Sequence, residues 1–286
     1  MNIIVLKGRM GNQMFQYALY LSFKYKGIDV CIDDNGSDSD LVVNFGINYK
    51  RLNLFRSLLR KVVRAVFYIT GDCHLPFRYT DKELGYDPIV FELRWAYIFG
   101  YWQNERYFED EEVKRRLRDD FSCPKVLKEH NCFSNWLRKV EFSNSVAVHF
   151  RRTDYLTENV NGNYLYKDIC TDDYYKKAID FILDKVLDAT FYVFSDDKDF
   201  ARIYVHDNLE KIGSFVVVDD DLSDLEEFYI MSACKHIILA NSTFSWWAAW
   251  LNPNPDSIQI APVPWVNMYD YSDIYTGRMI KISGDK

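Results

Sequence analysis

Short apolar runs alternate with amphipathic segments along most of the chain, which is typical of an α/β protein. Residues 2–8 (NIIVLKG) predict a strand that runs into a glycine turn. Residues 12–27 predict the helix that follows, because Leu19 and Phe23 continue an apolar stripe with a spacing of four. Residues 28–33 (IDVCID) predict the next strand. This β-α-β order predicts a parallel sheet.

The alternation becomes sharper in the second half of the chain. Thr171 is the expected N-cap of one helix there, and Ser223 with Glu226 forms the capping-box pattern at the start of another. Four runs rich in β-branched and aromatic residues predict strands at 145–150, 189–195, 214–219 and 236–241.

The length and composition suit a two-domain globular protein. The chain has 286 residues, 48% of them hydrophobic and 27% charged, which allows two domains of ordinary size. A proline and a polar turn interrupt the pattern near residues 122–143. We therefore expect an N-terminal domain at 1–135 and a C-terminal domain at 136–286.

The charge and the cysteines exclude several other classes. The net charge is −7 at pH 7, which argues against a general nucleic-acid binder, so an anionic ligand needs a local basic patch. No uncharged apolar run reaches the about 20 residues that span a membrane. The six cysteines contain no C-x-x-C pair, so we expect reduced thiols in a cytoplasmic protein and no metal site.

Polar side chains follow the predicted strands of the second half where each strand ends. The first strand delivers His149, Arg151 and Arg152, and the next strand ends at Ser195, Asp196 and Asp197. The last ends at Asn241, Ser242 and Thr243. Ligands of open α/β sheets bind at the carboxyl ends of the strands, and an arginine beside hydroxyls at a helix N-terminus suits a diphosphate. These residues predict a nucleotide-diphosphate site, although a structural salt bridge from Arg151 to Asp154 is an alternative.

Four sequence blocks resemble those of a known enzyme family. HFRRTDY (149–155) resembles the H-x-R-R-x-D motif of fucosyltransferases that use GDP-fucose, and FSDD (194–197) and NSTFSWWAAWL (241–251) resemble their second and third motifs. GRMGNQMFQYA (8–18) is similar to the G-x-G-N-Q-x-x-x-Y-A opening of the α-1,2-fucosyltransferases, glycosyltransferase family 11. The blocks occur in the family's order across nearly the whole chain.

This resemblance implies a GT-B glycosyltransferase architecture, with two Rossmann-like domains facing across a cleft. The acceptor would bind mainly to the N-terminal domain and GDP-fucose to the C-terminal domain. The implied reaction is an inverting, metal-independent transfer of L-fucose from GDP-β-L-fucose to the 2-hydroxyl of a terminal galactoside. The D-x-D sequence Asp38–Asp40 is therefore discounted as a metal site. The alternatives are a GT-B transferase with another nucleotide sugar and a non-catalytic carbohydrate-binding protein.

The resemblance and the chemistry together assign expected roles in donor binding. Arg151 should neutralise the β-phosphate as the bond to fucose breaks, and Arg152 should support the fold or the contact between domains. His149 should position the nucleotide, and Asp196 or Asp197 should contact guanine or ribose. The diphosphate should also receive hydrogen bonds from the third motif (Asn241, Ser242, Thr243, Ser245), and the turn at Gly11, Asn12 and Gln13 should approach the donor.

The catalytic base and the acceptor site are less defined by the sequence. Glu158 and Asp154 are equal candidates for the base that removes the acceptor proton, and a reaction without a protein base is a third possibility. Tyr101, Trp102 and Tyr107 are expected to stack on acceptor sugars, with Gln103 and Asn104 as hydrogen-bond partners; packing of the three rings in a core is an equal alternative.

The expected setting is bacterial surface polysaccharide synthesis in the cytoplasm. Residues 51–69 predict a basic amphipathic helix that would allow peripheral contact with the inner membrane. Packing of its apolar face in the protein is the alternative.

Overall fold

The computed structural model describes residues 1–36, 38–52, 78–81, 85–160 and 162–285, which form two compact units. Unit 1 is Met1–Ser122 and unit 2 is Cys123–Lys286. The predicted boundary at 135/136 lies 13 residues after this division. Segment 123–135 belongs to unit 2, and the helix at its end carries Trp136, which donates a hydrogen bond to Asp220 (2.6 Å) and packs on Tyr192. The predicted basic helix at 51–69 lies almost entirely outside the described residues.

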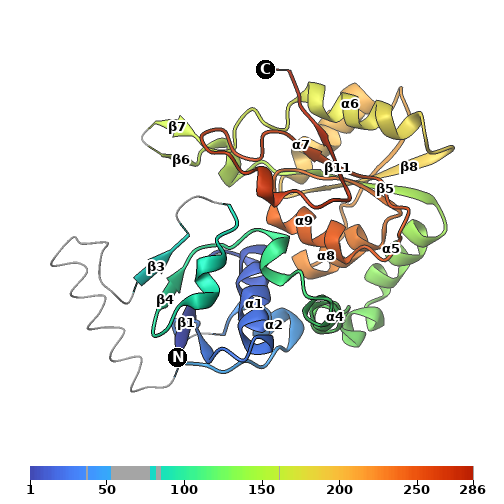
Figure 1. Ribbon diagram of the computed structural model, residues 1–286. Helices are drawn as coiled ribbons and strands as arrows, with labels where there is room; N and C mark the ends of the chain where they lie inside the picture. The colour runs from blue at the N-terminus through green and yellow to red at the C-terminus, as the bar shows by residue number, and fades with distance from the viewer. Residues whose placement is uncertain (37, 53–77, 82–84, 161, 286) are drawn as a thin grey trace. The chain divides into compact units, whose positions relative to one another are not determined.

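Unit 1 contains a parallel four-stranded sheet in the order β2-β1-β4-β3. Its first three elements confirm the predicted β-α-β opening (Figure 1). The strands are β1 (Asn2–Val5), β2 (Val30–Asp33), β3 (Arg78–Thr80) and β4 (Tyr97–Phe99). The helices are α1 (Met10–Tyr25), α2 (Asp40–Phe45), α4 (Glu111–Asp120) and the short η1 (Pro88–Glu92) and η2 (Glu105–Phe108).

Unit 2 contains a parallel six-stranded sheet in the order β12-β11-β10-β5-β8-β9. The strands are β5 (Asn144–Phe150), β8 (Ala189–Ser195), β9 (Ser214–Val217), β10 (His236–Ile238), β11 (Gln259–Pro262) and β12 (Met279–Ile282), with a small hairpin of β6 (Asn159–Val160) and β7 (Asn163–Tyr164). The pattern analysis predicted four of the six sheet strands and missed β11 and β12.

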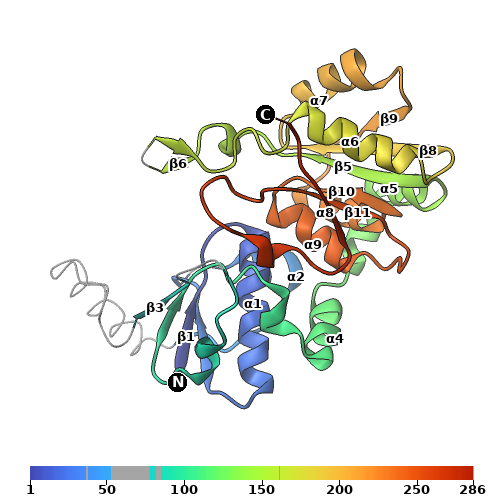
Figure 2. The same ribbon diagram turned by 45° about the horizontal axis from the view of Figure 1, so that its top comes forward.

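The helices of unit 2 cover both faces of its sheet. Figures 1 and 2 show α6 and α7 on one side of the sheet and α8 and α9 on the other. The helices are α5 (Asn131–Glu141), α6 (Asp172–Leu183), α7 (Lys198–Tyr204), α8 (Asp224–Ala233) and α9 (Thr243–Leu251), with the short η3 (Lys125–Glu129), η4 (Asp154–Leu156), η5 (Val205–Leu209) and η6 (Ser272–Ile274). Thr171 caps α6, and the capping box of Ser223 and Glu226 opens α8, so both cap predictions are confirmed.

The strand order of unit 2 reverses at β5. From β5 the chain continues outward to β8 and β9, and it then returns to place β10 on the other side of β5. In an open α/β sheet this reversal leaves a crevice at the carboxyl ends of the two central strands, where ligands bind. The topology therefore locates the candidate site at the ends of β5 and β10.

Candidate active site

The structure brings the three predicted groups of polar residues together in unit 2. Strand β5 pairs with β8 on one side and with β10 on the other, in parallel register. His149 and Arg151 therefore end up between Asp196, just after β8, and Ser242, which follows β10. The prediction that these segments share one edge of a sheet is confirmed.

Arg151 is held at this edge by an ion pair with Asp196. Its Nη1 lies 3.1 Å from Oδ2 of Asp196, and the two side chains are only 14% and 19% exposed. Asp196 also accepts hydrogen bonds from the backbone N–H of Arg152 (2.9 Å) and from the hydroxyl of Thr153. Burial raises the pKa of the Asp196 carboxyl, but Thr153, Arg151 and the Arg152 N–H together lower it below its usual value. Asp196 thus fixes the chain that follows β5, and its predicted contact with guanine or ribose stays a prediction.

Arg152 and Asp197 contact helix α7. The guanidinium of Arg152 lies 3.5 Å above the ring of Phe200, and its Nε is 3.6 Å from Oδ2 of Asp197. Asp197 also caps α7 by accepting from the N–H of Phe200 (3.0 Å). These contacts hold Arg152 against α7, and its predicted role in the fold or the domain contact stays a prediction.

His149 is buried and uncharged near neutral pH. Its side chain lies beside the ring of Phe244 on the side of the sheet covered by α8 and α9, with ring centroids 5.7 Å apart. Burial, with the nearby charge of Arg151, lowers the pKa of His149 to about 3. Its Nδ1 has no hydrogen-bond partner among the described residues. A buried polar atom of this kind is available to a ligand or a water molecule.

The residues at the start of α9 divide into two groups. Ser242 is the N-cap, and its hydroxyl accepts from the N–H of Phe244 (3.3 Å), while Thr243 opens the helix and is half-buried. Asn241 and Ser245 are buried and bonded within the protein: Asn241 donates to the carbonyl of Trp265 (3.1 Å), and Ser245 donates to backbone carbonyls 3.2 Å away. The Ser245 hydroxyl is occupied within the protein, Thr243 is half-buried at the helix N-terminus, and the predicted diphosphate contacts of these residues stay predictions.

In unit 1, the predicted glycine turn is held by amide side chains. Gly11 and Asn12 are in the first turn of α1, and Asn12 accepts from the amide of Gln103 (2.7 Å). Gln13 donates to the carbonyl of Gly8 (3.0 Å) and accepts from the N–H of Asp40 (2.9 Å). Both ends of the Gln13 amide therefore tie α1 to its own turn and to α2.

Gln16 is a structural residue of this turn that the sequence analysis missed. It is fully buried, accepts from the N–H of Lys7 (3.1 Å) and donates to the carbonyl of Gly100 (2.8 Å). The only sequence signal was a polar residue on the apolar side of a helix.

Most of the aromatic residues predicted to bind the acceptor are packed inside unit 1. Trp102 and Tyr107 are 1% and 2% exposed and meet edge to face, so the core alternative is correct for these two. Asn104 caps η2. Tyr101, the third ring, is half-buried and thus more accessible than the other two. Nζ of Lys7 lies 4.6 Å from the centre of the Tyr101 ring.

Of the two candidate bases, Glu158 is exposed on the connection between β5 and α6. Asp154 begins the short helix η4 on the same connection, and its side chain lies outside the described part of the structure. Both assignments stay predictions.

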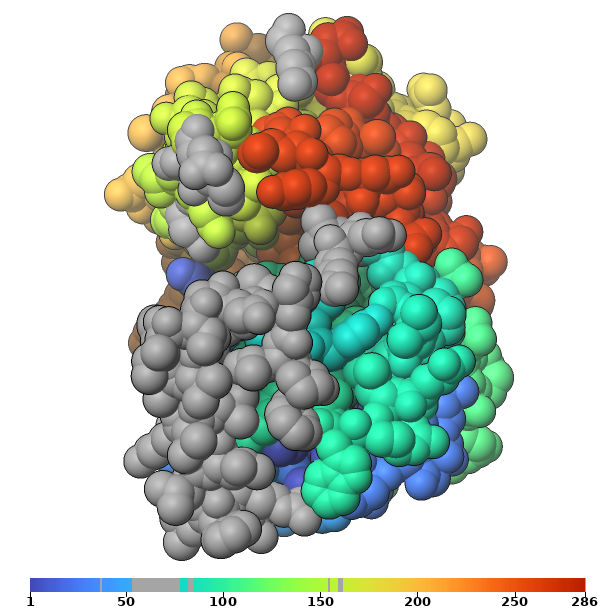
Figure 3. Space-filling view, turned by 60° about the vertical axis from the view of Figure 1, so that its left-hand side comes forward, coloured from blue at the N-terminus to red at the C-terminus, as the bar shows by residue number. Residues whose placement is uncertain are grey.

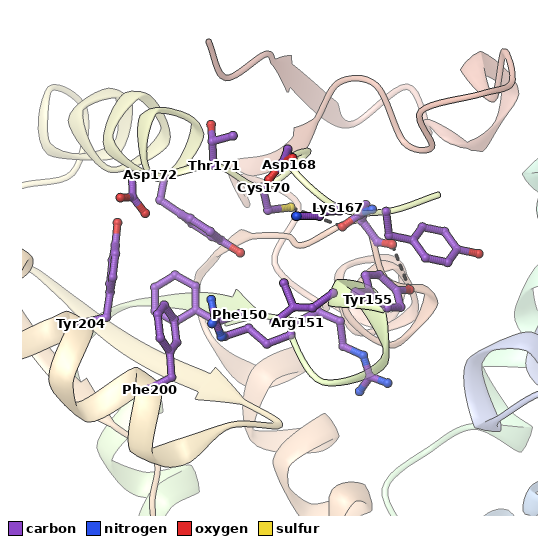
Figure 4. A pocket seen from close by; sticks show the side chains of 15 residues that line it. Phe150, Arg151, Tyr155, Lys167, Asp168, Cys170, Thr171, Asp172, Phe200 and Tyr204 are labelled. Carbon is purple, nitrogen blue, oxygen red and sulfur yellow. Dashed lines mark hydrogen bonds between the residues drawn. The ribbon is translucent and has the colours of Figure 1, made fainter. Parts of the chain in front are cut away.

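A cavity of about 310 Å³ lies beside this edge in unit 2, between the β5–α6 connection and helices α6 and α7. Figure 4 shows Phe150, Phe200 and Tyr204 at one end of it and Tyr155 and Lys167 at the other. Tyr155 donates to the backbone carbonyl of Asn241 (3.2 Å), which connects the cavity wall to the residue before α9. The sequence analysis did not identify this cavity.

Among the described residues, no group of three or more His, Cys, Asp or Glu side chains is placed to hold a metal ion. Within the same part of the chain, no helix has the length and apolar character needed to cross a bilayer.

Several solved structures have a similar arrangement of elements. One is POFUT1 in complex with GDP, which is 12% identical with a TM-score of 0.48 over 91% of this chain and 97% of that chain. Another is ADP-heptose lipopolysaccharide heptosyltransferase II of Escherichia coli, which is 13% identical with a TM-score of 0.43 over 99% and 90% of the two chains.

Sequence comparison finds glycosyltransferases. An alpha-1,2-colitosyltransferase of Escherichia coli is 31% identical over 93% of both chains. The O-antigen biosynthesis glycosyltransferase WbnK of Escherichia coli is 28% identical over 91% of this chain and 93% of that protein. Galactoside 2-alpha-L-fucosyltransferase SEC1 of Bos taurus is 23% identical over 86% of this chain and 62% of that protein.

The family assignment rests on nearly the whole chain. Its two α/β units with parallel sheets are those of the GT-B glycosyltransferases. The model of glycosyl transferase family 11 matches residues 1–276. This chain is a glycosyltransferase that belongs to glycosyl transferase family 11.

Proposed function

We propose that this enzyme is an inverting α-1,2-fucosyltransferase that moves L-fucose from GDP-β-L-fucose to the 2-hydroxyl of a terminal galactoside, without a metal ion. The observation that carries the proposal is the position of Arg151. It stands at the carboxyl end of β5, beside the point where β10 leads into the N-terminus of α9, and it is oriented by Asp196. A guanidinium and a helix N-terminus at one edge of a sheet favour a diphosphate leaving group.

In the proposed reaction, the acceptor oxygen attacks the anomeric carbon of fucose and the bond from that carbon to the β-phosphate oxygen breaks. The electron pair of this bond leaves with GDP, which gains negative charge. Arg151 stabilises that charge through its guanidinium, and the N-terminus of α9 adds neutral donors. The acceptor proton passes to a carboxylate, Glu158 or Asp154, or to water.

His149 is proposed to contact the nucleotide as a neutral imidazole. Because burial lowers its pKa to about 3, it adds no positive charge to the site at physiological pH. Its buried Nδ1 is suited to a hydrogen bond with a group of the base or ribose. The charge that balances the diphosphate is therefore assigned to Arg151.

Transfer of colitose is the second candidate function. It is favoured by the 31% identity to the alpha-1,2-colitosyltransferase of Escherichia coli. Colitose is the 3-deoxy analogue of L-fucose, so the two donors share the diphosphate and differ by one hydroxyl. The similarity to an O-antigen biosynthesis glycosyltransferase supports a role in bacterial surface polysaccharide synthesis for either donor. The expected setting remains the cytoplasmic side of the inner membrane.

The test is a donor panel with a galactose-terminated acceptor, with and without EDTA. GDP-fucose, GDP-colitose, GDP-mannose and UDP-galactose are compared, and the product linkage is read by NMR. We expect fucose at the galactose 2-hydroxyl, unaffected by EDTA. Turnover with GDP-colitose but not with GDP-fucose would show that colitose is the transferred sugar. Turnover with only GDP-mannose or UDP-galactose would overturn both candidates.

Arg151→Ala should lower kcat at least 100-fold, because it removes a charge aimed at the leaving group. Arg151→Lys should recover only part of the rate, since lysine cannot pair with two oxygens in a plane. Arg138→Ala is the matched control, because Arg138 lies on the exposed part of α5 in the same unit. Full activity of Arg151→Ala would refute the role of this arginine.

A further inference from the structure

The cavity beside the β5–α6 connection lies on the face of the sheet opposite to His149. Phe150 lines it, whereas His149, the preceding residue of β5, packs on Phe244 at the other face. Successive residues of a strand point to opposite faces, so the cavity does not include the position proposed for the nucleotide. Of the residues expected to contact the donor, Arg151 and Asn241 also line this cavity, so it borders the phosphate end of that site.

The hairpin end of the cavity favours an uncharged ligand, whereas the charge of Arg151 belongs to the end that borders the proposed phosphate site. At the end near the hairpin, Lys167 and Asp168 both line the cavity, and their opposite charges balance. This end therefore offers no surplus positive charge for a phosphate.

The same end carries aromatic rings next to polar groups. Tyr155 and Tyr166 both line the cavity and are stacked, with ring centres 4.3 Å apart and planes 20° from parallel. The guanidinium of Arg151 lies 5.3 Å from the centre of the Tyr155 ring. Aromatic rings beside a carboxylate and an ammonium group suit a sugar, whose ring has apolar C–H faces and whose hydroxyls both donate and accept. The volume of about 310 Å³ is at the small end of ligand pockets and is suited to one pyranose unit.

An exposed surface continues from this end onto the β6–β7 hairpin. Tyr164 of β7 is 45% exposed, and Nζ of Lys167 lies 4.8 Å from its ring centre. Asn267, in the loop after β11, donates to the carbonyls of Tyr164 and Lys167 at 3.2 and 2.7 Å, so this loop supports the base of the hairpin. The next two residues of the loop, Met268 and Tyr269, are 40% and 49% exposed. Figure 3 shows the yellow-green β5–α6 connection beside the orange-red segment of unit 2.

We propose that the cavity end formed by Tyr166, Lys167 and Asp168, together with exposed Tyr164, is an acceptor subsite of unit 2 that binds a saccharide unit next to the reacting galactose. The assignment rests on the proposed transfer to a galactoside. A donor sugar is a single unit attached to the diphosphate, whereas this surface extends from Arg151 outward along the hairpin. An extended surface matches an oligosaccharide acceptor. The resemblance to the family implied acceptor contacts mainly on the N-terminal domain, so the subsite adds a second acceptor-binding region.

The test compares a galactose-terminated tetrasaccharide with methyl β-galactoside as acceptors of Tyr164→Ala and Asp168→Asn. Asparagine preserves the shape of the side chain and tolerates the positive φ of 61° at position 168. Tyr25→Ala is the matched control, because Tyr25 is 49% exposed at the end of α1 in unit 1. We expect each subsite variant to raise the KM for the tetrasaccharide about tenfold. The kcat, the KM for the donor and the KM for methyl β-galactoside should change less than twofold.

Direct binding separates this proposal from the proposed function. Saturation-transfer NMR and calorimetry measure binding of the tetrasaccharide without donor to wild type and variants. If Tyr164→Ala weakens binding of the tetrasaccharide about tenfold, the subsite is supported even when the wild-type enzyme transfers no fucose. In that case the absence of transfer refutes only the proposed fucosyltransferase activity. Unchanged binding and KM in both variants would overturn the subsite. An increase in the KM for the donor as large as that for the tetrasaccharide would also overturn it.

Discussion

The stability of unit 2 should depend on pH through His149. The side chain is 5% exposed and is kept neutral, because burial lowers its pKa to about 3 from an ordinary 6.5. In the unfolded chain His149 takes up a proton below pH 6.5, whereas in the folded protein it stays neutral until about pH 3. The contribution of neutral His149 to the free energy of unfolding is therefore fully present above pH 6.5, and it is lost as the pH falls from 6.5 towards about 3.

The size of the effect follows from the two pKa values. At pH 5.0 the unfolded state binds almost one more proton than the folded state, and integration from pH 7.5 gives a loss of about 2 kcal/mol in the free energy of unfolding. Asp196 makes little contribution in this range, because its pKa is below an already low ordinary value of 3.8. His236, whose pKa is also lowered by burial, contributes equally to wild type and to a variant at position 149.

The measurement is urea unfolding of wild type and His149→Gln at pH 7.5 and pH 5.0, followed by tryptophan fluorescence. Five of the seven tryptophans belong to unit 2, so the signal reports mainly on that unit. Glutamine has a similar volume and does not titrate. We expect wild type to lose about 2 kcal/mol more than the variant between the two pH values. An equal pH dependence of the two proteins would refute the burial of a neutral histidine at this position.

Two other substitutions test side-chain interactions that hold the backbone, one in each unit. Asp196→Asn removes the ion pair with Arg151 and should destabilise unit 2 by about 2 kcal/mol. It should also lower kcat/KM, because Arg151 loses its orientation. If this variant keeps wild-type stability and kcat/KM, Asp196 does not position the arginine. Gln16→Leu leaves the N–H of Lys7 and the carbonyl of Gly100 without their partner and should destabilise unit 1 by about 2 kcal/mol. Hydrogen exchange at the Lys7 amide should become faster in that variant, and unchanged protection would contradict the assignment.

The residues at the carboxyl ends of the unit 2 strands were predictable, because local sequence shows where a strand ends. A strand pattern followed by charged residues locates the carboxyl end of a strand, and the connections between parallel strands bring those ends to one edge. His149, Arg151 and Asp196 were placed together on this basis. The cap residues Thr171 and Ser223 were predictable for the same reason, since each acts on an N–H group three residues away.

The partners of these side chains were not predictable, because they depend on contacts between distant segments. Asp196 binds Thr153 across 43 positions, and Gln16 binds Gly100 across 84. The burial of Trp102 likewise depends on how η2 packs, and its neighbouring polar residues resemble an exposed binding loop. The cavity runs along residues 150–175 but is closed by Phe200 and Tyr204 of α7 and by Asn241, so the local sequence alone does not predict it.

The order of strands in unit 2 has a consequence for how the enzyme is made. The central pair of strands, β5 and β10, comes from segments about 90 residues apart, with both outer strands of one side synthesised in between. The crevice at the ends of this pair forms only when the returning chain closes a long loop onto β5, a step with a high entropic cost. A nucleotide that bridges the crevice would bind only the chain that has completed this closure. It should therefore act as a pharmacological chaperone, which raises the yield of folded enzyme by drawing the chain through the pairing of β10 with β5.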